Sequence, residues 1–579
     1  MRFYAGLVTL LVLAVLCGCK KNSGGGGTVP DPPDPPVPPV IKPQVDPPVA
    51  KTIGFFLDDW QPKTFGGVTS VSNITAPSTA GITVSIDRSN VLTKVPVSIF
   101  GNNANLWMTQ MVTEPSLMQS ITNLKPNVIR FPGGSISDVF FWNALPNVPP
   151  ADAPTHLLNA SGTSNPAGFW YGKNPDGWTL SVDNYYKVLQ QTGNKGIITI
   201  NYGYARYGTG TNPVAAAAHL AADWVRYDKG RTKFWEIGNE NFGDWEAGYR
   251  IKTADNKDGQ PEYATGQLYG QHFKVFADSM RKAATEVGTT IFIGAVLYDA
   301  TPEGWATNTV KTWNSGLLPA AGSTPDFYVV HNYYTNFQTN ANAAEILATP
   351  QVVTKKMSDY VNQSVTGNAQ TPKPIALDEY NIFSQGSKQA VSHINGLHAV
   401  MVIGESLKNN FGLAARWGFA NGWDNGNDHG MFSSGDEPDG VPKWTPRPAF
   451  YHMYFMQRFF GDRLVFSVSS DVDIVSYATS FTSGEMGVVL VNKNAGSKTV
   501  EVKVDNFSMG ARFLWYTLTG SNDNGEFSRK TLVNGEGPTI AAGGPANYQT
   551  IAAKAAPTAG GIRVEVPARS AVYMVMEKK

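Results

Sequence analysis

The chain has 579 residues, which exceeds what one hydrophobic core usually serves, so we expect a main domain and at least one accessory module. Its 46 Lys and Arg residues balance 46 Asp and Glu residues, and a formal net charge of zero argues against a nucleic-acid partner. Aromatic residues form 11% of the chain and include 14 Trp and 23 Tyr, whose rings suit stacking against sugars.

The N-terminus has the features of an export signal. Arg2 precedes an apolar run over residues 4–18, which is shorter than the roughly 20 residues of a membrane span and fits a cleaved signal peptide. The sequence Leu-Cys-Gly-Cys at 16–19 resembles a bacterial lipobox, in which Cys19 becomes the lipid-bearing first residue. We therefore expect export and a lipid anchor on a bacterial membrane, at the outer membrane or cell surface. The alternative is an ordinary signal peptide with an incidental cysteine.

Residues 20–50 are predicted to form a linker. Four glycines occupy 24–27, and the stretch 30–48 is rich in proline pairs. Such pairs favour polyproline II, which extends about 3.1 Å per residue, so the segment is expected to act as a stalk of roughly 60 Å. Binding of an SH3-type domain is the competing interpretation.

Between residues 96 and 460, short apolar runs alternate with segments such as 215–227 and 269–286, in which apolar residues recur at helical spacing. This alternation predicts an α/β fold, a (β/α)8 TIM barrel with its helices outside. The predicted barrel strands are 97–102, 127–131, 196–202, 233–240, 290–296, 326–333, 374–379 and 414–420.

Residues 461–579 change to period-2 alternation, as in 488–491, 499–504 and 563–575, which predicts an accessory all-β sandwich. The N-terminal segment 51–95 contains an alternating run near 82–86 without an obvious sheet of its own. We predict that this N-terminal strand joins the C-terminal sandwich.

Polar sequences stand at the ends of three predicted barrel strands, where TIM barrels build their active sites. They are Trp-Glu-Ile-Gly-Asn-Glu at 235–240, His-Asn-Tyr-Tyr at 331–334 and Ala-Leu-Asp-Glu-Tyr-Asn at 376–381. Hydrolysis of a glycosidic bond with retention needs a carboxylic acid and a carboxylate about 5–5.5 Å apart. Glu240 and Glu379 can supply this pair. Gly-Asn-Glu alone is a weak signal, since such a Glu is often a solvated loop residue, and the second motif strengthens it.

These motifs resemble those of clan-A retaining glycoside hydrolases, nearest to the family 51-like α-L-arabinofuranosidase group. The resemblance spans roughly residues 80–579 and implies that Glu240 is the acid/base and Glu379 the nucleophile. The sequences that carry it are Arg-Phe-Pro-Gly-Gly at 130–134, Asn-Tyr-Gly at 201–203, Gly-Asn-Glu at 238–240 followed by Gly243 and Trp245, His331 to Tyr333, and Asp-Glu-Tyr-Asn at 378–381.

These roles require Glu240 to have a raised pKa and Glu379 to stay ionised. Asn239 is expected to bind the sugar 2-hydroxyl, an interaction that strengthens in the transition state. His331, Tyr333 and Arg130 are expected to orient the nucleophile or the sugar.

Other carboxylates near the motifs are given lesser roles. Glu236 has the strand parity of Glu240 but lies deeper, which indicates a buried partner, and Asp378 should point away from its neighbour Glu379. Asp138, Asp244 and Glu246 are expected in loops, as contacts at the rim of the site or as solvated side chains.

The expected sugar platform comprises Trp142, Trp417 and Trp423, although tryptophan is as often core as ligand surface. Asn201 and Asn102 complete the expected substrate contacts. Shortly after the Phe-Gly of the first strand, arabinofuranosidases usually carry an acidic residue, whereas this chain continues with Asn-Asn-Ala-Asn at 102–105. A long insertion to about Trp178 follows the Arg-Phe-Pro-Gly-Gly sequence. These departures indicate a remodelled substrate site.

The sequence therefore predicts a retaining glycosidase for plant or algal polysaccharide or oligosaccharide, with α-L-arabinofuranosidase as the leading activity. The alternatives are an endo-acting β-glucanase or xylanase of the same clan, a non-catalytic surface glycan-binding lipoprotein, and a structural adhesion protein. No cofactor is expected, because the chain lacks zinc, P-loop and cysteine-pair motifs. A calcium site in the loop 421–429 is a further possibility, although its oxygen ligands lack the usual spacing.

Overall fold

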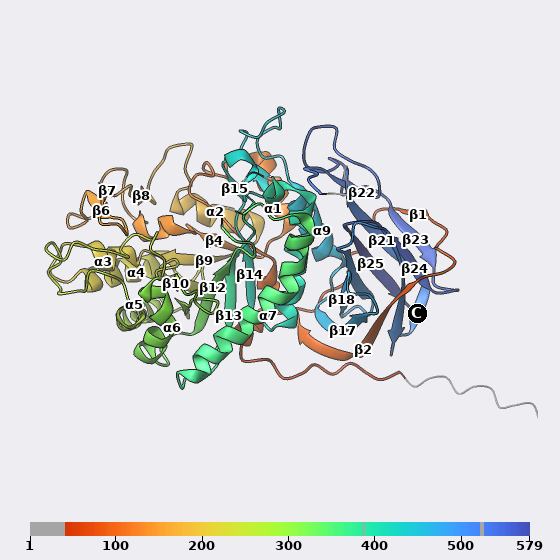
Figure 1. Cartoon of the computed structure of the whole chain (residues 1–579), viewed down its shortest axis with the longest axis horizontal. Coiled ribbons are helices and arrows are strands. Elements are labelled where there is room, and N and C mark those ends of the chain that lie inside the picture. Colours follow the sequence, from red (N-terminus) through yellow and green to blue (C-terminus); the bar gives the residue numbers. More distant parts are fainter. Residues whose placement is uncertain (1–40, 338, 385, 387, 522–525) are drawn as a thin grey trace, which may run out of the picture. The chain divides into compact units, whose positions relative to one another are not determined.

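The computed structural model describes residues 41–579, except residues 338, 385, 387 and 522–525. The predicted signal peptide, Cys19 and most of the linker lie outside the described residues. Figure 1 shows the two parts of the described chain, a barrel surrounded by helices and a β-sheet that carries the C-terminus.

Parallel strands close into a barrel of eight within the described residues, in the order β10-β11-β12-β13-β14-β3-β4-β9. This confirms the predicted TIM barrel. The strands are β3 Gly101–Asn103, β4 Val128–Phe131, β9 Lys195–Ile200, β10 Phe234–Ile237, β11 Phe292–Val296, β12 Phe327–Asn332, β13 Ile375–Tyr380 and β14 Leu413–Arg416. The first strand is shorter than predicted because Val97–Phe100, after Pro96, forms a 3-10 helix that buries Ile99 and Phe100.

Helices cover the outside of the barrel and bury one face against the strands. In α5, for example, Tyr269, Phe273, Phe276 and Met280 follow the i, i+3, i+4 pattern and are buried. The helices are α1 Pro115–Leu124, α2 Val182–Thr192, α3 Gly203–Tyr207, α4 Pro213–Asp228, α5 Gly266–Glu286, α6 Asn308–Ala321, α7 Ala343–Gly367, α8 His393–Lys408 and α9 Pro448–Phe459. Across the part of the chain that the structure describes, no helix combines the length and hydrophobicity needed to span a bilayer.

Short strand pairs lie in the loops at the carboxyl end of the barrel. The insertion after β4 contributes two pairs, and the long loop after β14 contributes one. They are β5 Phe140–Phe141 with β8 Trp170–Tyr171, β6 His156–Leu158 with β7 Ser164–Pro166, and β15 Ala420–Asn421 with β16 Phe432–Ser433.

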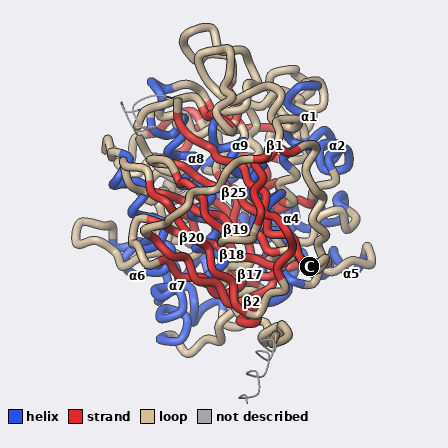
Figure 2. The backbone as a smooth tube through the Cα atoms, turned by 90° about the vertical axis from the view of Figure 1, so that its right-hand side faces the viewer, coloured by secondary structure: helices blue, strands red, loops and turns tan. Residues whose placement is uncertain are grey.

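The second part is a mixed sheet whose strands form one curled, hydrogen-bonded path in the described chain, in the order β1-β23-β21-β25-β19-β18-β17-β2-β20-β24, with β22 beside β21. Figure 2 shows this sheet from its outer side. The strands are β1 Val71–Asn73, β2 Ile82–Lys94, β17 Arg463–Ser469, β18 Ile474–Ser480, β19 Met486–Asn492, β20 Lys498–Asp505, β21 Met509–Gly520, β22 Thr531–Val533, β23 Ala553–Pro557, β24 Ile562–Val566 and β25 Ser570–Lys578.

The curled sheet is sandwich-like, because distant strands of it share one buried apolar core. Val84 and Ile86 on β2 pack in this core with Val488 on β19, Val564 on β24 and Met574 on β25. β2 lies between β17 and β20. The prediction that an N-terminal strand joins the C-terminal module is therefore confirmed, and β1 adds a second one through β23.

Helix α9 joins the barrel to the sheet. Nδ1 of His452 on α9 lies 2.8 Å from the Tyr573 hydroxyl on β25, and its Nε2 lies 3.1 Å from Nδ1 of His393 on α8. Burial lowers the pKa of both imidazoles, that of His393 to about 4, so both are neutral at physiological pH. The two parts are thus fastened by buried polar contacts as well as apolar packing.

Residues 41–57 connect the sheet to the floor of the barrel. The Gln44 amide donates to the Ser480 hydroxyl, and Asp46 pairs with Arg463, so this end of the predicted linker lies against the sheet. Farther on, Ile53 and Phe56 are buried against first residues of barrel strands, including Val128, Phe234, Phe327 and Leu413. This segment closes the amino-terminal end of the barrel.

Candidate active site

Glu240 and Glu379 converge at the carboxyl end of the barrel. Glu379 is the fifth residue of β13, and Glu240 follows β10 with a left-handed backbone (φ 42°). One carboxylate oxygen of each lies within 4.8 Å of the other, and both also lie within that distance of a His331 nitrogen. The side chain of Glu379 is 6% exposed and that of Glu240 18%, so the pair opens to solvent on the Glu240 side.

His331 connects the two motifs. Its Nδ1 lies 2.9 Å from Oε1 of Glu240 and 3.8 Å from Oε2 of Glu379, and its Nε2 lies 3.0 Å from Oδ1 of Asp378. Burial opposes the imidazolium, but Glu379, Asp378 and Glu240 together raise the pKa of His331 well above its ordinary value. The ring therefore carries a proton on each nitrogen at neutral pH.

Arg130 binds Glu379, the candidate nucleophile, from the buried interior of the barrel. Its fully buried guanidinium donates from Nη1 to Oε2 of Glu379 at 2.9 Å, from Nε to Oε2 of Glu236 at 2.8 Å, and from Nη2 to Oδ1 of Asn239 at 2.8 Å. Because a guanidinium presents its donors in a fixed fork, this residue sets the relative positions of Glu236 and Asn239, on and just after β10, and of Glu379 on β13. Arg130 thus binds carboxylates rather than the surface of a ligand.

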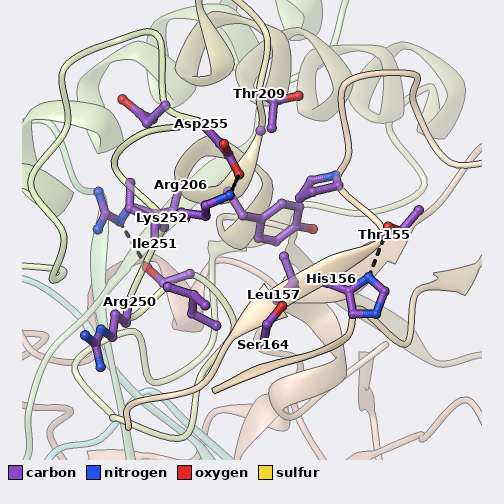
Figure 3. A pocket seen from close by; sticks show the side chains of 16 residues that line it. Thr155, His156, Leu157, Ser164, Arg206, Thr209, Arg250, Ile251, Lys252 and Asp255 are labelled. Carbon is purple, nitrogen blue, oxygen red and sulfur yellow. Dashed lines mark hydrogen bonds and ion pairs between the residues drawn. The ribbon is translucent and has the colours of Figure 1, made fainter. Parts of the chain in front are cut away.

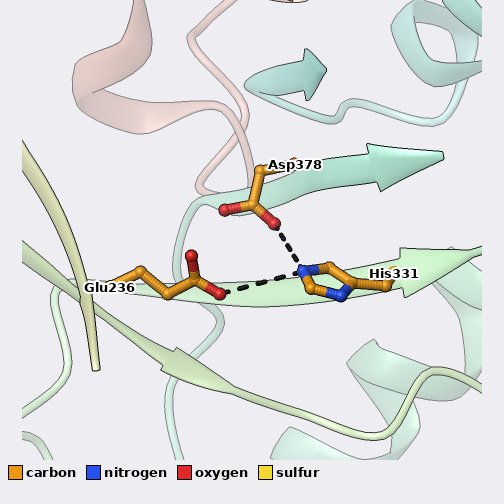
Figure 4. Close-up of side chains that lie close together, drawn as sticks. All are labelled: Glu236, His331 and Asp378. Atoms are coloured by element: carbon orange, nitrogen blue, oxygen red, sulfur yellow. Dashed lines mark hydrogen bonds and ion pairs between the residues drawn. The ribbon is translucent and has the colours of Figure 1, made fainter. Parts of the chain in front are cut away.

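Asp378 does not point away from Glu379 as the strict alternation of a strand predicts. The pairing of β13 with β14 shifts register between Leu377 and Tyr380, and such an irregularity re-aims side chains. Both acids therefore face the barrel interior, where Asp378 contacts His331 and lies 3.6 Å from Arg130. Figure 4 shows His331 with one ring nitrogen directed at both Glu236 and Asp378.

The protonation of the pair differs from the sequence expectation. Burial opposes ionisation of Glu240, but the hydrogen bond and charge of His331 outweigh it and leave the pKa of Glu240 below its ordinary value. Burial raises the pKa of Glu379, and the charges of His331 and Arg130 offset only part of that rise. The expectation of a raised pKa at Glu240 is therefore wrong for the unliganded site, because the sequence did not show that His331 contacts Glu240.

Asn239 is held by Arg130 and Glu246. Its Oδ1 accepts from Arg130, and its Nδ2 donates to Oε1 of Glu246 at 2.9 Å, leaving one amide hydrogen unassigned. The Ser135 hydroxyl donates to the same Glu246 oxygen at 2.7 Å. Asn239 therefore lies beside the carboxylates at the end of β10, oriented by side chains that the sequence did not reveal, and its contact with the sugar stays a prediction.

Asp138 and Glu246 are buried, so the expectation that they are solvated or lie at the rim is wrong. Asp138 accepts from the backbone N–H groups of Gly203 and Asn239, and burial raises its pKa to about 7. Burial, with the charges of Asp138 and Glu240, also raises the pKa of Glu246 well above its ordinary value. Asp244 is exposed.

Aromatic groups flank the carboxylates on both sides. The Tyr333 hydroxyl donates to Oε1 of Glu379 at 2.7 Å, and its ring stacks on Phe383 with centroids 4.4 Å apart. On the other side, the indole N–H of Trp245 donates to Oε2 of Glu240 at 3.1 Å while 59% of the residue stays exposed. Trp245 is the more accessible aromatic ring, and its position five residues after Glu240 was the sequence signal for it.

The three tryptophans of the expected sugar platform have different environments. Trp142 is 6% exposed, stacks on Trp224 with centroids 5.6 Å apart and donates to the Leu220 carbonyl. It therefore packs in the core, and its assignment as a sugar contact is wrong. Trp417 lies over Gly133 and Gly134, where added Cβ atoms would approach its ring to 2.9 and 2.6 Å. Trp423 is half-buried in the loop after β14.

Two asparagines were predicted to contact the substrate. Asn201 has a structural role, and Asn102 has no role that the structure explains. The Asn201 side chain donates to the Phe140 carbonyl and the Tyr207 hydroxyl, and accepts from the Tyr204 backbone, so it fixes the start of α3. Asn102 is buried with no hydrogen-bond partner among the described residues. Its neighbour Asn103 faces the interior and accepts from Arg130 at 3.1 Å. The strand alternation therefore selects Asn103, and Asn102 as the site residue is wrong.

Two sets of donors have the residue types of a metal site, Glu236–His331–Asp378 and Glu240–His331–Glu379. Both sets already surround protonated His331, and Arg130 supplies a second positive charge to their carboxylates. Two positive charges, on His331 and Arg130, thus lie among the four carboxyl groups of these sets and hold them in fixed positions.

Comparison with known proteins identifies a related domain. Residues 120–346 match the family model described as the alpha-L-arabinofuranosidase 1 domain. A probable alpha-L-arabinofuranosidase C from Aspergillus terreus (strain NIH 2624 / FGSC A1156) is 23% identical over 295 residues, which cover 47% of this chain and 52% of that protein. The chain thus aligns with only about half the length of this relative.

Solved structures share the fold over 86% of the chain. A family 51 alpha-L-arabinofuranosidase from Bifidobacterium longum matches with a TM-score of 0.59 and 15% identity, over 100% of its own length. A family 44 xyloglucanase from Paenibacillus polymyxa matches with a TM-score of 0.55 and 11% identity, over 99% of its length. At these identities the likeness shows a common architecture of barrel and sheet.

Proposed function

We propose that the chain is a retaining glycoside hydrolase that releases α-L-arabinofuranosyl residues from plant or algal polysaccharides or their oligosaccharides. The match of residues 120–346 to the alpha-L-arabinofuranosidase 1 domain supports this proposal. One observation carries this proposal, the approach of a Glu240 and a Glu379 oxygen to within 4.8 Å. Retaining enzymes keep their carboxyl groups about 5–5.5 Å apart, whereas inverting enzymes need about 6.5–9.5 Å to admit a water.

Glu379 is the proposed nucleophile. Arg130 donates a hydrogen bond to one of its oxygens and Tyr333 donates one to the other. The carboxylate is therefore held in a fixed orientation. In the first step, a Glu379 oxygen forms a bond to the anomeric carbon while the bond from that carbon to the leaving oxygen breaks. The more buried position of Glu379 keeps water away from this attack.

Glu240 is the proposed acid/base, and His331 is its proton partner. In the unliganded site the shared proton rests on His331, because the pKa of Glu240 is lowered and that of His331 raised. Transfer across the 2.9 Å contact from Nδ1 to Oε1 readies Glu240 to protonate the leaving oxygen. In the second step, Glu240 removes a proton from the water that attacks the anomeric carbon, and the bond to Glu379 breaks.

An endo-acting glucanase or xylanase is the second candidate, and a distinct observation favours it. Trp245, Trp305 and Phe337 are 59%, 87% and 68% exposed and lie on the loops that follow β10, β11 and β12. Exposed rings on neighbouring loops at the catalytic end are a suitable surface for a chain of pyranose rings. The fold shared with a xyloglucanase is consistent with this alternative.

The decisive experiment compares Glu379→Ala and Glu240→Ala on nitrophenyl α-L-arabinofuranoside and on arabinoxylan, with products analysed by size. We expect Glu379→Ala to lose about 10³-fold or more in kcat. Glu240→Ala should regain turnover of the nitrophenyl substrate when azide is added. Asp244→Ala, an exposed acid in the same loop as Glu240, is the matched control and should keep wild-type rates.

If both glutamate variants keep full activity, the assignment is wrong. Saturable sugar binding by the wild type without any released product would instead identify a glycan-binding protein. Release of arabinose alone would support the arabinofuranosidase, and release of oligosaccharides from an unbranched glucan or xylan would support the endo-acting alternative.

Export and lipid anchoring at Cys19, with the protein held at the outer membrane or cell surface, are part of the proposal and rest on the sequence of the N-terminus. Mass spectrometry of the mature protein tests them. A diacylated or triacylated Cys19 as first residue is expected, and an unmodified N-terminus elsewhere would contradict the anchor.

A further inference from the structure

A cavity of about 440 Å³ lies in the loops at the carboxyl end of the barrel, apart from the carboxylate pair (Figure 3). Residues 154–158 and Ser164 of the insertion form one wall, and residues 206–209 and residues 248, 250–252, 255 and 256 form the others. These segments follow β4, β9 and β10, which are neighbours in the barrel. Its volume falls within the range of roughly 300–1,000 Å³ typical of small-molecule sites.

The cavity exists because of the long insertion that follows the Arg-Phe-Pro-Gly-Gly sequence. The hairpin β6–β7 is tied to the opposite wall by Arg250, which donates from Nη1 to the Ala160 carbonyl at 3.0 Å. At the hairpin turn, a Cβ on Gly162 would lie 2.5 Å from this nitrogen, so the turn and the guanidinium are in close contact. Without the insertion the cavity would be an open surface.

Positive charge exceeds negative charge in its walls. Arg206, Arg250 and Lys252 line the cavity with one acid, Asp255. Lys252 pairs with Asp255 at 3.0 Å, and Arg250 pairs with Glu262 at 2.6 Å. Arg250 and Lys252 are therefore each paired with an acid, and Arg206 is the remaining cation of the walls.

Arg206 is 1% exposed and has no carboxylate partner among the described residues. Four of its N–H groups donate to neutral oxygens, namely the carbonyls of Gly248, Pro261 and Glu262 and the amide of Gln260. Its charge is therefore unneutralised, and a positive charge in a poorly hydrated wall favours an anion in the adjoining space.

The remaining walls suit a sugar ring better than a small inorganic anion. Leu157, Ile251 and the buried ring of Tyr207 provide apolar surface, and Thr155 and Thr209 provide hydroxyl groups. Sugar sites combine these two features, since a pyranose has apolar C–H faces and polar edges.

One wall of the cavity and the proposed acid/base belong to the same loop, the one that follows β10. Gly248 in this wall is three residues after Trp245, whose indole binds Glu240, so one short loop joins the two sites. The acid/base protonates the leaving oxygen, so the leaving-group part of a substrate lies on the Glu240 side.

We propose that this cavity is a subsite for a uronic acid residue in the leaving-group part of the polysaccharide. The carboxylate of that sugar would face the wall that contains Arg206, Arg250 and Lys252. This inference rests on the proposed function for the direction of the substrate. The binding of an acidic sugar can be measured without turnover.

The test uses the full chain carrying Glu379→Gln, so that no probe is consumed. Isothermal titration calorimetry at low salt compares xylotetraose with the same oligosaccharide bearing a glucuronic acid branch. We expect the acidic probe to bind about tenfold more tightly, as for a charge-assisted hydrogen bond. Adding Lys252→Glu should remove most of this preference and leave the affinity for xylotetraose unchanged.

Lys355→Glu is the matched control, because Lys355 is 65% exposed and paired with Asp359 on α7, much as Lys252 is 64% exposed and paired with Asp255. It should keep the full preference. Equal binding of the two probes, or a preference that survives Lys252→Glu, would overturn the subsite. Failure of the proposed function has a different signature, since it would appear as a wild type inactive on arabinofuranosides while these affinities remain measurable.

Discussion

The hydroxyl group of Tyr333, the residue that follows β12, donates to Oε1 of Glu379 on the neighbouring strand β13 over 2.7 Å. This contact and the Arg130 contact bind opposite oxygens of one carboxylate. The nucleophile is therefore positioned from two sides before any substrate enters.

Replacing Tyr333 by Phe removes one of these contacts and keeps the ring stacked on Phe383. Hydrogen bonds to charged groups contribute about 1.5–3 kcal/mol, so kcat should fall roughly tenfold to a hundredfold. Steady-state kinetics on a nitrophenyl glycoside measure this. An unchanged kcat would show that Arg130 alone orients Glu379.

His331→Gln should change the pH dependence of stability. The folded-state pKa of His331 lies well above the value of 6.5 expected when unfolded, so protonation stabilises the folded protein. That contribution is complete below about pH 6.5 and is lost as the pH rises through the folded-state pKa. The difference in unfolding free energy between wild type and variant should therefore be larger at pH 6 than at pH 9.5, as measured by urea denaturation. An equal difference at both pH values would mean that His331 is neutral in the folded state.

Glu246→Gln tests whether this buried acid is held protonated. Its folded-state pKa lies well above 4.5, so the wild type loses stability as the pH rises from 4.5 toward that pKa, and the neutral variant does not. The melting temperature of the variant should exceed that of wild type at pH 8 and approach it near pH 4.5. Activity should survive, because the glutamine oxygen can still accept from Asn239. Glu246→Ala removes this acceptor and should lower kcat.

Trp142→Ala and Trp245→Ala should separate packing from substrate contact. Trp142 is buried against Trp224, so its loss should cost about 3–5 kcal/mol of stability, with KM close to wild type. Trp245 is 59% exposed and binds Glu240, so its loss should leave the melting temperature nearly unchanged and lower kcat/KM. Chemical denaturation and kinetics on the same preparations measure both effects. A reversed pattern would exchange the two roles.

The periodicity of the chain was sufficient to predict the barrel. All eight predicted runs overlap strands, because a parallel strand buried on both faces is a continuous apolar segment that ends where polar residues begin. The polar residues at those ends, Glu240 and Glu379, could also be chosen, since strand ends at one mouth of a barrel must meet.

Contacts between distant segments could not be predicted in the same way. The sequence gives no sign that His331 lies between Glu240 and Asp378, and this contact reverses the expected pKa of Glu240. The register shift in β13 likewise turns Asp378 inward. Asp138 and Glu246 look like ordinary loop acids, and only the packing of three loops buries them. Strand alternation, applied to residues 101–103, would have selected Asn103 over Asn102.

The placement of Ile53 and Phe56 under the barrel has a consequence for the lipid-anchored form that we propose. If Cys19 carries the anchor, proteolysis before residue 41 would release the protein without disturbing these contacts. Cleavage beyond residue 57, with loss of the segment before it, would expose the apolar strand starts around Phe234 and Phe327 to water. Release with a closed barrel floor and release with an open one are thus separated by fewer than twenty residues of chain.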